Sequence, residues 1–272
     1  MANNSVANIR SAGTWLAQHG LGDSPPTPLL ATRLAARSRA RLFGSVLLAV
    51  LFLVAALAQV SGPLAKSASG GPGPGGPTPV LILGASIVGL LLVRTLFDAW
   101  VRRVDRQAGA ALARRVAHPV QPGWRDLLGL PYAGLAAGTF AGAFALGASA
   151  LAVGEGTMRQ AAVVLLIAVV GVGAGAVLQL RELLARPVVA EDEVSLTADV
   201  IMRIEDARES AAPSVLGALP MVLLFGFAPG WWNVAALVFL VLGVAAHIAV
   251  HVRTPCAATM ARHMVGAPEG LR

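Results

Sequence analysis

The chain has 272 residues, of which 56% are hydrophobic and only 13% are charged. So few polar side chains cannot cover a water-soluble globule of this length, which excludes that class and predicts an all-α polytopic membrane protein. The net charge is +7, but the basic residues flank apolar runs instead of forming one basic domain, so we expect no nucleic-acid partner. Cys256 is the only cysteine, which excludes an intramolecular disulfide and a cysteine zinc cluster.

Residues 1–41 are polar and mixed, and we expect them to form a cytosolic N-terminal tail. A short helix over 6–19 is separated by a proline-rich segment from the basic stretch 33–41. Ile9, Trp15 and Leu16 fall near one face of that helix, which makes it a candidate membrane-surface helix.

Six apolar segments are each long enough to cross a bilayer core about 30 Å thick. The predicted spans are about 42–60, 80–100, 130–153, 161–180, 211–228 and 231–252, which make 42–252 one six-helix transmembrane domain and leave 253–272 as a second tail. Nineteen of the 21 Lys and Arg residues fall on one side of this topology. The asymmetry predicts that both termini and both long loops are cytoplasmic, in a multi-pass protein of the cell membrane.

Both long loops are predicted to carry amphipathic helices. Span two continues into a basic extension that reaches residue 115, and a second helix over 196–209 follows the acidic run Glu191, Asp192 and Glu193. Pairing of the second loop's acids with the arginines of 102–115 would give a charged platform beneath the membrane. The acidic run is therefore a candidate docking site for a soluble partner, although a solvated or ion-paired face explains it without function. A divalent-cation site is the less favoured reading, because no calcium-loop spacing is present.

Glycines recur at intervals of four in spans three and four. Gly134, Gly138 and Gly142 lie in the third span, and Gly171 and Gly175 lie in the fourth. Because glycine removes side chains from one helix stripe, we expect these stripes to form a tight antiparallel hairpin.

Pro220 lies near the middle of the fifth span, where its missing N–H predicts a kink. It is also a candidate hinge. Packing remains the favoured reading for Pro220 and for the glycines, because neighbouring helices tolerate both residue types in membranes.

Two pairs of polar residues fall at membrane depth. Arg94 and Asp98 are one turn apart in span two, and ionisable groups there often mark pathways. A snorkelling arginine paired with its i+4 carboxylate is the favoured interpretation and involves no function. His247 and His251 share one face of span six, but two ligands do not complete a zinc site. We therefore expect neither a metal nor a cofactor.

The segment 186–209 resembles a cytosolic loop in multi-pass proteins of GC-rich Gram-positive bacteria, a group without an established activity to transfer. At the level of fold, the six spans, cytosolic termini and polar loop between spans two and three resemble the membrane subunits of export-type ABC transporters. The short segment 229–233 and the extended loop 181–210 depart from that pattern. Fold-level likeness alone does not establish function.

No Gly-x-Ser-x-Gly, phosphate-loop or His-Glu-x-x-His motif occurs in the sequence, so we expect no enzymatic activity. The leading hypothesis is a permease-like subunit of a membrane transport complex, whose cytosolic helices bind a separate ATPase. The alternative is a membrane sensor or scaffold that transports nothing. An intramembrane metal or redox enzyme that uses His247 and His251 is a second alternative, and an oligomer is compatible with each hypothesis.

Overall fold

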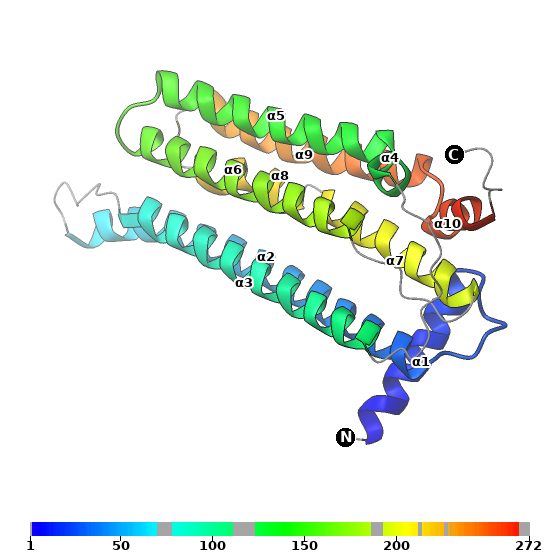
Figure 1. The fold of residues 1–272 in the computed structure, drawn as a ribbon. Helices are drawn as coiled ribbons and strands as arrows, with labels where there is room; N and C mark the ends of the chain where they lie inside the picture. The colour runs from blue at the N-terminus through cyan, green and yellow to red at the C-terminus, as the bar shows by residue number, and fades with distance from the viewer. Residues whose placement is uncertain are drawn as a thin grey trace.

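The computed structural model describes residues 2–69, 78–110, 123–185, 193–211, 214–225, 228 and 230–266, and these residues contain helices and no strand. Figure 1 shows the helices as an elongated bundle. In chain order they are α1 (Ala2–Gln18), α2 (Pro28–Ser69), α3 (Thr78–Ala110), α4 (Trp124–Leu128), α5 (Leu130–Val153), α6 (Gly156–Ala185), α7 (Glu193–Ala211), α8 (Ser214–Leu224), α9 (Trp231–Arg253) and α10 (Ala257–Gly266).

Five helices are long and apolar enough to cross a membrane, which is consistent with the predicted all-α membrane protein. The candidate spans are Pro28–Leu57, Val80–Asp105, Leu130–Val153, Gly156–Ala185 and Trp231–Arg253. The sixth predicted span, about 211–228, contains α8, which has 11 residues. At 1.5 Å per residue α8 is roughly 17 Å long, too short to cross the hydrocarbon core by itself. The described residues therefore contain five such helices and not six.

The first membrane helix begins well before the apolar run that identified it. Pro28 occupies the first turn of α2, and the hydroxyl of Thr27 accepts a hydrogen bond from the N–H of Leu30 at 3.2 Å. Proline at the first helical position and a threonine cap are both typical helix starts. The basic stretch 33–41, expected in the cytosolic tail, is thus an extension of the first span's helix.

The long helices form two groups. Figure 1 shows α2 and α3 side by side along one edge, and α5, α6, α8 and α9 together along the other. An apolar core joins the groups: Leu51 of α2 and Leu83 and Ile87 of α3 belong to the same cluster as Leu165 and Val169 of α6. All described members of this cluster are hydrophobic. We call it the apolar core.

Helices α1, α4, α7 and α10 gather at one end of the bundle, on the right-hand side of Figure 1. We call this the polar end and the opposite end the far end. Helix α7 lies at its centre, and every residue from Leu196 to Ile204 is buried. The predicted apolar face of this helix does pack against its neighbours, but the opposite, polar face is buried as well. That second face forms the candidate site described below.

Two small apolar clusters enclose α7. Val200, Ile201 and Ile204 pack with residues of α4, α5, α6 and α10, which include Leu127, Tyr132, Leu183 and Ala261. On another side, Ala198 and Met202 pack with Leu16 of α1 and Leu30 of α2. Helix α7 thus contacts elements from the beginning, the middle and the end of the chain.

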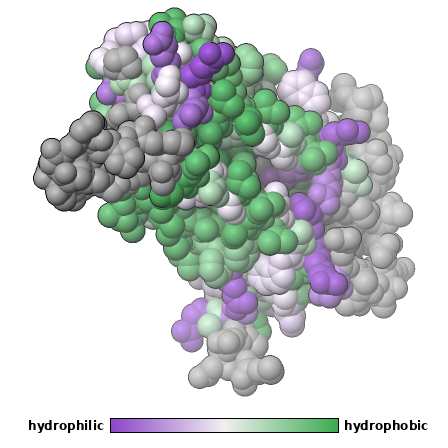
Figure 2. Space-filling view, turned by 90° about the vertical axis from the view of Figure 1, so that its left-hand side faces the viewer, coloured by the Kyte–Doolittle hydropathy of each residue, from purple (hydrophilic) through white to green (hydrophobic). Residues whose placement is uncertain are grey.

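The outer surface of the long helices is strongly apolar. Figure 2 views the molecule from the left-hand side of Figure 1, and hydrophobic residues cover most of its described surface, with hydrophilic residues toward the edges. Exposed large hydrophobic residues occur along α2, α3 and α9; examples are Leu53, Leu92 and Leu242. An exposed apolar surface of this extent suits a protein that is embedded in lipid.

Helices α5 and α6 form the expected hairpin, but the predicted glycine stripes do not lie between them. A Cβ atom on Gly147 would contact Leu166, and one on Gly173 would contact Phe140, so these glycines lie at the α5–α6 contact. A Cβ on Gly142 would instead meet Phe239 of α9 at 2.5 Å. The remaining predicted glycines face other surroundings: Gly171 lies near Leu91 of α3, while Gly134, Gly138 and Gly175 would meet no atom within 4 Å.

The difference follows from the rotation of α5 about its axis. Its buried residues are Tyr132, Thr139, Ala143, Gly147 and Ala150, which recur at intervals of three, four and seven. The stripe of Gly134, Gly138 and Gly142 precedes this face by one residue, or about 100° around the helix.

Pro220 lies buried inside α8, and the kink and hinge expected there stay predictions.

Candidate functional site

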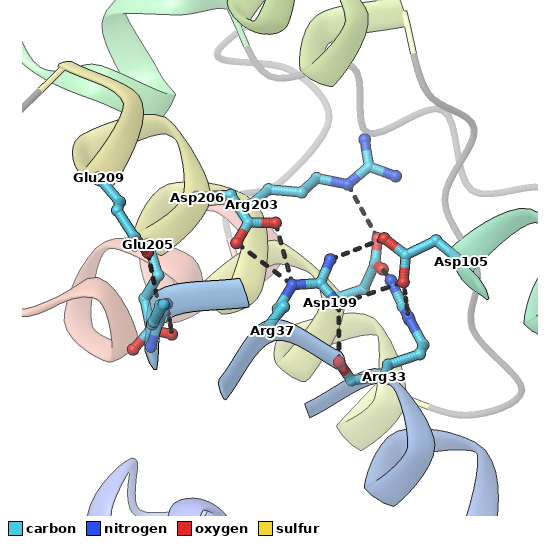
Figure 3. Close-up of polar contacts among 9 residues, drawn as sticks. Arg33, Arg37, Asp105, Asp199, Arg203, Glu205, Asp206 and Glu209 are labelled. Atoms are coloured by element: carbon cyan, nitrogen blue, oxygen red, sulfur yellow. Dashed lines mark hydrogen bonds and ion pairs between the residues drawn. The ribbon is translucent and has the colours of Figure 1, made fainter. Parts of the chain in front are cut away.

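Three arginines project from one face of α2 at the polar end. Arg33, Arg37 and Arg41 are four residues apart, so they stack on successive turns of the helix. Figure 3 shows Arg33 and Arg37 directed toward carboxylates of α7 and toward Asp105 of α3. We call this set of ion pairs the α2–α7 junction.

The first turn of the junction is deeply buried. Arg33 donates from Nε to Asp105 at 3.0 Å and from Nη2 to Asp199. Asp199 also accepts a hydrogen bond from Nε of Arg203, one turn along α7, at 2.9 Å. Asp199 is fully buried and Arg203 is 2% exposed, so water does not screen these charges.

The second turn of the junction, which carries Arg37 of α2, connects three helices. Arg37 donates from Nη1 and Nη2 to the two carboxylate oxygens of Asp105, at 3.1 and 2.9 Å. Its Nε donates to both oxygens of Asp206, at 3.0 and 3.2 Å. A single guanidinium therefore joins α2 to α3 and α7, and the paired contacts exploit the planar donor geometry that only arginine offers.

The third turn is more open to solvent. Arg41 pairs with Glu209 at 2.7 Å and with Glu205 at 3.3 Å, and the side chains of Arg41 and Glu209 are 43% and 46% exposed. Glu205 also pairs with Nε2 of His19, the residue directly after α1, at 3.1 Å. The junction thus runs from a dry inner part to a solvated outer part.

The inner part is electrically balanced. Arg33, Arg37 and Arg203 face Asp105, Asp199 and Asp206, so three positive and three negative groups lie together. Burial of an isolated charge costs several kcal/mol, whereas a balanced and hydrogen-bonded set offsets most of that penalty. The balance explains why α7 can be buried on its polar face.

The contact between His19 and Glu205 shifts both groups toward their charged forms. The hydrogen bond to Glu205 raises the pKa of His19 above its usual 6.5, against the opposing effect of burial. Burial alone would raise the pKa of Glu205, but the His19 hydrogen bond and the charge of Arg41 outweigh it and lower that pKa. As the pH falls through the neutral range, His19 is therefore protonated and its contact with Glu205 becomes an ion pair.

The partners of the α7 acids differ from the prediction where the structure describes them. We expected the arginines of 102–115, but four acids of α7 pair with α2, and Arg102 pairs with Glu182 of α6 at 3.3 Å. The side chains of Arg106, Arg114 and Arg115 lie outside the described residues. The arginines of 33–41 had only indicated topology in the sequence. Their i, i+4, i+8 spacing, with Asp199 and Asp206 seven apart on α7, was the signal that could have revealed the junction.

Several predicted site residues stay untested. Arg94 lies half-buried on α3, but the side chain of Asp98 lies outside the described residues. Glu191 and Asp192 also lie outside them, and Glu193 is described only as the first residue of α7. The rings of His247 and His251 are 6.3 Å apart. Among the described residues, no group of three or more His, Cys, Asp or Glu could hold a metal ion.

Comparison of the chain with protein-family models, with curated proteins and with solved structures finds no match. Functional inference therefore rests on the residues and their geometry.

Proposed function

We propose that the chain is a permease-like subunit of a membrane transport complex, without enzymatic activity of its own, in which α7 connects a cytosolic partner to the membrane helices. The observation that carries the proposal is the enclosure of α7. Buried ion pairs hold it to α2, whose Arg33 and Arg37 also pair with Asp105 of α3, and apolar contacts hold α7 to α5 and α6. A displacement of α7 would therefore move several spans together.

The topology that we propose has six crossings and cytoplasmic termini, in the cell membrane. Helices α1 and α10 lie at the same end of the bundle, which supports an even number of crossings. Five helices are long enough to span, and the segment around α8 connects α7 at the polar end with the start of α9 at the far end. Basic residues are concentrated at the polar end, which favours a cytoplasmic location for it.

The proposed partner is a cytosolic ATPase, because the chain contains no nucleotide-binding motif of its own. Most acids of α7 are occupied by the α2–α7 junction and cannot receive another protein. The acidic run Glu191, Asp192 and Glu193, which precedes or begins α7, remains the candidate docking site.

A specific observation favours the alternative of a sensor or scaffold. Away from the polar end, Thr139 is the one buried polar residue among those described. Hydroxyl groups on the spans bond to carbonyls of their own helices, as Ser86, Thr139 and Ser149 do at 2.8, 2.8 and 3.0 Å. A polar substrate would need hydrogen-bond donors, and the donors of these three hydroxyls are already engaged.

Affinity purification from native membranes in mild detergent, followed by mass spectrometry, separates the two functions. The variant reverses the acidic run (Glu191→Lys, Asp192→Lys and Glu193→Lys), and Glu155→Lys, which reverses one carboxylate at the far end, is the control for position. Recovery of a cytosolic ATPase with the wild type and the control, but not with the triple variant, supports the permease-like subunit. Recovery of no ATPase with any of the three proteins contradicts it and favours the sensor or scaffold.

A further inference from the structure

Basic and aromatic side chains surround Tyr132, in the first turn of α5 at the polar end. The guanidinium carbon of Arg208 lies 4.9 Å from the centre of the tyrosine ring. The tyrosine hydroxyl lies 3.2 Å from Nδ1 of His251, and the ring of His247 stands edge-on to the tyrosine at 6.5 Å. We call Tyr132, Arg208, His247 and His251 the Tyr132 cluster.

The Tyr132 cluster contains unsatisfied hydrogen-bonding groups. Among the described residues, two buried side-chain nitrogens lack a hydrogen-bond partner, Nε of Arg208 and Nδ1 of His247. The end nitrogens of Arg208 are engaged, one with the carbonyl of Pro255 at 3.0 Å and the other with the sulfur of Met260. Buried polar groups in folded proteins are nearly always paired with protein, water or a ligand. Both unpaired nitrogens lie beside the same aromatic ring.

The charge of the cluster favours an anion. No described carboxylate forms an ion pair or hydrogen bond with its four members. Burial lowers the pKa of Arg208, yet an arginine side chain keeps its proton in proteins. A positive guanidinium opposes the binding of a metal cation by the neighbouring histidines. It favours an oxyanion, whose oxygens can accept hydrogen bonds from Arg208, Tyr132 and an imidazole N–H.

The position of the cluster favours a lipid as the source of that anion. Tyr132 begins one candidate span and His251 lies in the last turn of another, which is the depth of lipid headgroups. The surface around these helix ends is apolar: Leu130, Ile248 and Val252 are 68%, 56% and 75% exposed. Trp124, with Arg125 over its ring, is exposed beside them on α4. Apolar side chains can contact acyl chains where the cluster contacts the headgroup.

We propose that the Tyr132 cluster binds the phosphate group of an anionic phospholipid in the leaflet at the polar end. Basic sites between membrane helices on the cytoplasmic side are a recognised way to hold such headgroups. The lipid would supply acceptors to the two unpaired nitrogens and would join α5, α7 and α9, so bound lipid would also stabilise the docking of α7.

Native mass spectrometry of the purified full chain tests this proposal with three probes: phosphatidylglycerol, phosphatidylcholine with the same acyl chains, and inorganic phosphate. We expect the wild type to bind one phosphatidylglycerol at least about tenfold more tightly than phosphatidylcholine, because the choline cation beside the phosphate of the latter is repelled by Arg208. Arg208→Gln should remove most of this preference. Arg159→Gln, at the far end, removes the same charge and should leave the preference unchanged.

Arg208 also donates a hydrogen bond to the segment before α10, so Arg208→Gln could lose lipid binding because the fold is disturbed. A second variant separates this effect from loss of the site. His247→Leu removes an unpaired nitrogen without touching that bond and should also weaken phosphatidylglycerol binding. Equal binding of the two lipids by the wild type would overturn the proposal, as would folded Arg208→Gln and His247→Leu variants that bind like the wild type. If inorganic phosphate alone displaces the lipid or binds as tightly, the site recognises free phosphate and the lipid assignment fails.

Discussion

The apolar core and the α2–α7 junction both connect α2 and α3 to the rest of the molecule, but by opposite means. In the apolar core, Leu83 and Ile87 of α3 pack with Leu165 of α6. At the junction, Arg33 and Arg37 of α2 meet carboxylates of α7, and Asp199 is fully buried. One contact has no charge, and the other consists almost entirely of charges.

The difference shows what each contact can contribute. Lipid tails are as apolar as leucine, so apolar packing between spans gains little from exclusion of lipid and fixes register only by shape. Ion pairs between buried partners tolerate few alternative arrangements, because each misplaced charge would lose its counter-charge. We therefore expect the junction to set how α7 and α2 meet, while the core can adjust.

The largest expected effect comes from the inner part of the junction. Asp199→Asn should leave Arg33 and Arg203 without a full counter-charge and lower the free energy of unfolding by about 3–5 kcal/mol. Thermal unfolding in detergent, compared with the wild type, measures the loss. Adding Arg33→Met to Asp199→Asn should restore part of the stability, because the double variant removes one charge of each sign. Additive losses would show that the pair is not coupled.

The next effect lies at a close contact between helices outside the junction. Gly142→Ala places a Cβ 2.5 Å from the ring of Phe239, so the ring must move, at an expected cost of about 1–3 kcal/mol. Gly138→Ala is the matched control on the same helix, because its Cβ meets no atom within 4 Å. That variant should be neutral or stabilise by up to about 1 kcal/mol through helix propensity. Equal melting temperatures for the two variants would contradict the assigned rotation of α5.

The sequence predicted some of these features and not others, for physical reasons. Hydropathy located every long apolar helix, because a lipid-facing span must be apolar along its length. It could not show that Arg33 and Arg37 are buried, because a basic residue beside a span looks the same whether it marks topology or enters a protein interior. The partners, Asp105 and Asp199, are distant in sequence and meet only through tertiary packing.

The glycine stripes illustrate the same limit. A spacing of four identified one face of α5, yet the buried face of that helix lies one residue further on, at Ala143 and Gly147. Periodicity reveals that a stripe exists, but only the neighbouring helices decide which stripe they cover. The sequence alone likewise could not predict the clusters around Tyr132 and α7, because each cluster joins at least three segments that are far apart in the chain.

A smaller effect should depend on pH through His19. Because contact with Glu205 raises the pKa of His19 in the folded protein, its stabilising effect is fully present below about 6.5, the usual value. It is lost as the pH rises through the raised folded value. His19→Gln should thus lower the free energy of unfolding more at pH 6 than at pH 8.5, by no more than about 1 kcal/mol for this partly buried pair at the solvated part of the junction. An equal difference at both pH values would contradict the assignment.

The smallest effect should come from Arg41, and it completes the comparison along the junction itself. Arg41→Gln removes a pair whose partners are 43% and 46% exposed, so the expected loss is about 0–1 kcal/mol and should fall further in high salt. Arg37→Gln, one turn deeper, should cost about 3–5 kcal/mol at any salt concentration, because it leaves Asp105 and Asp206 without their shared counter-charge. The free energy of unfolding of both variants, measured at low and high salt, shows how the strength of the ion pairs changes from the outer to the inner part of the junction. If Arg41→Gln cost as much as Arg37→Gln, burial would not be what gives the inner junction its strength.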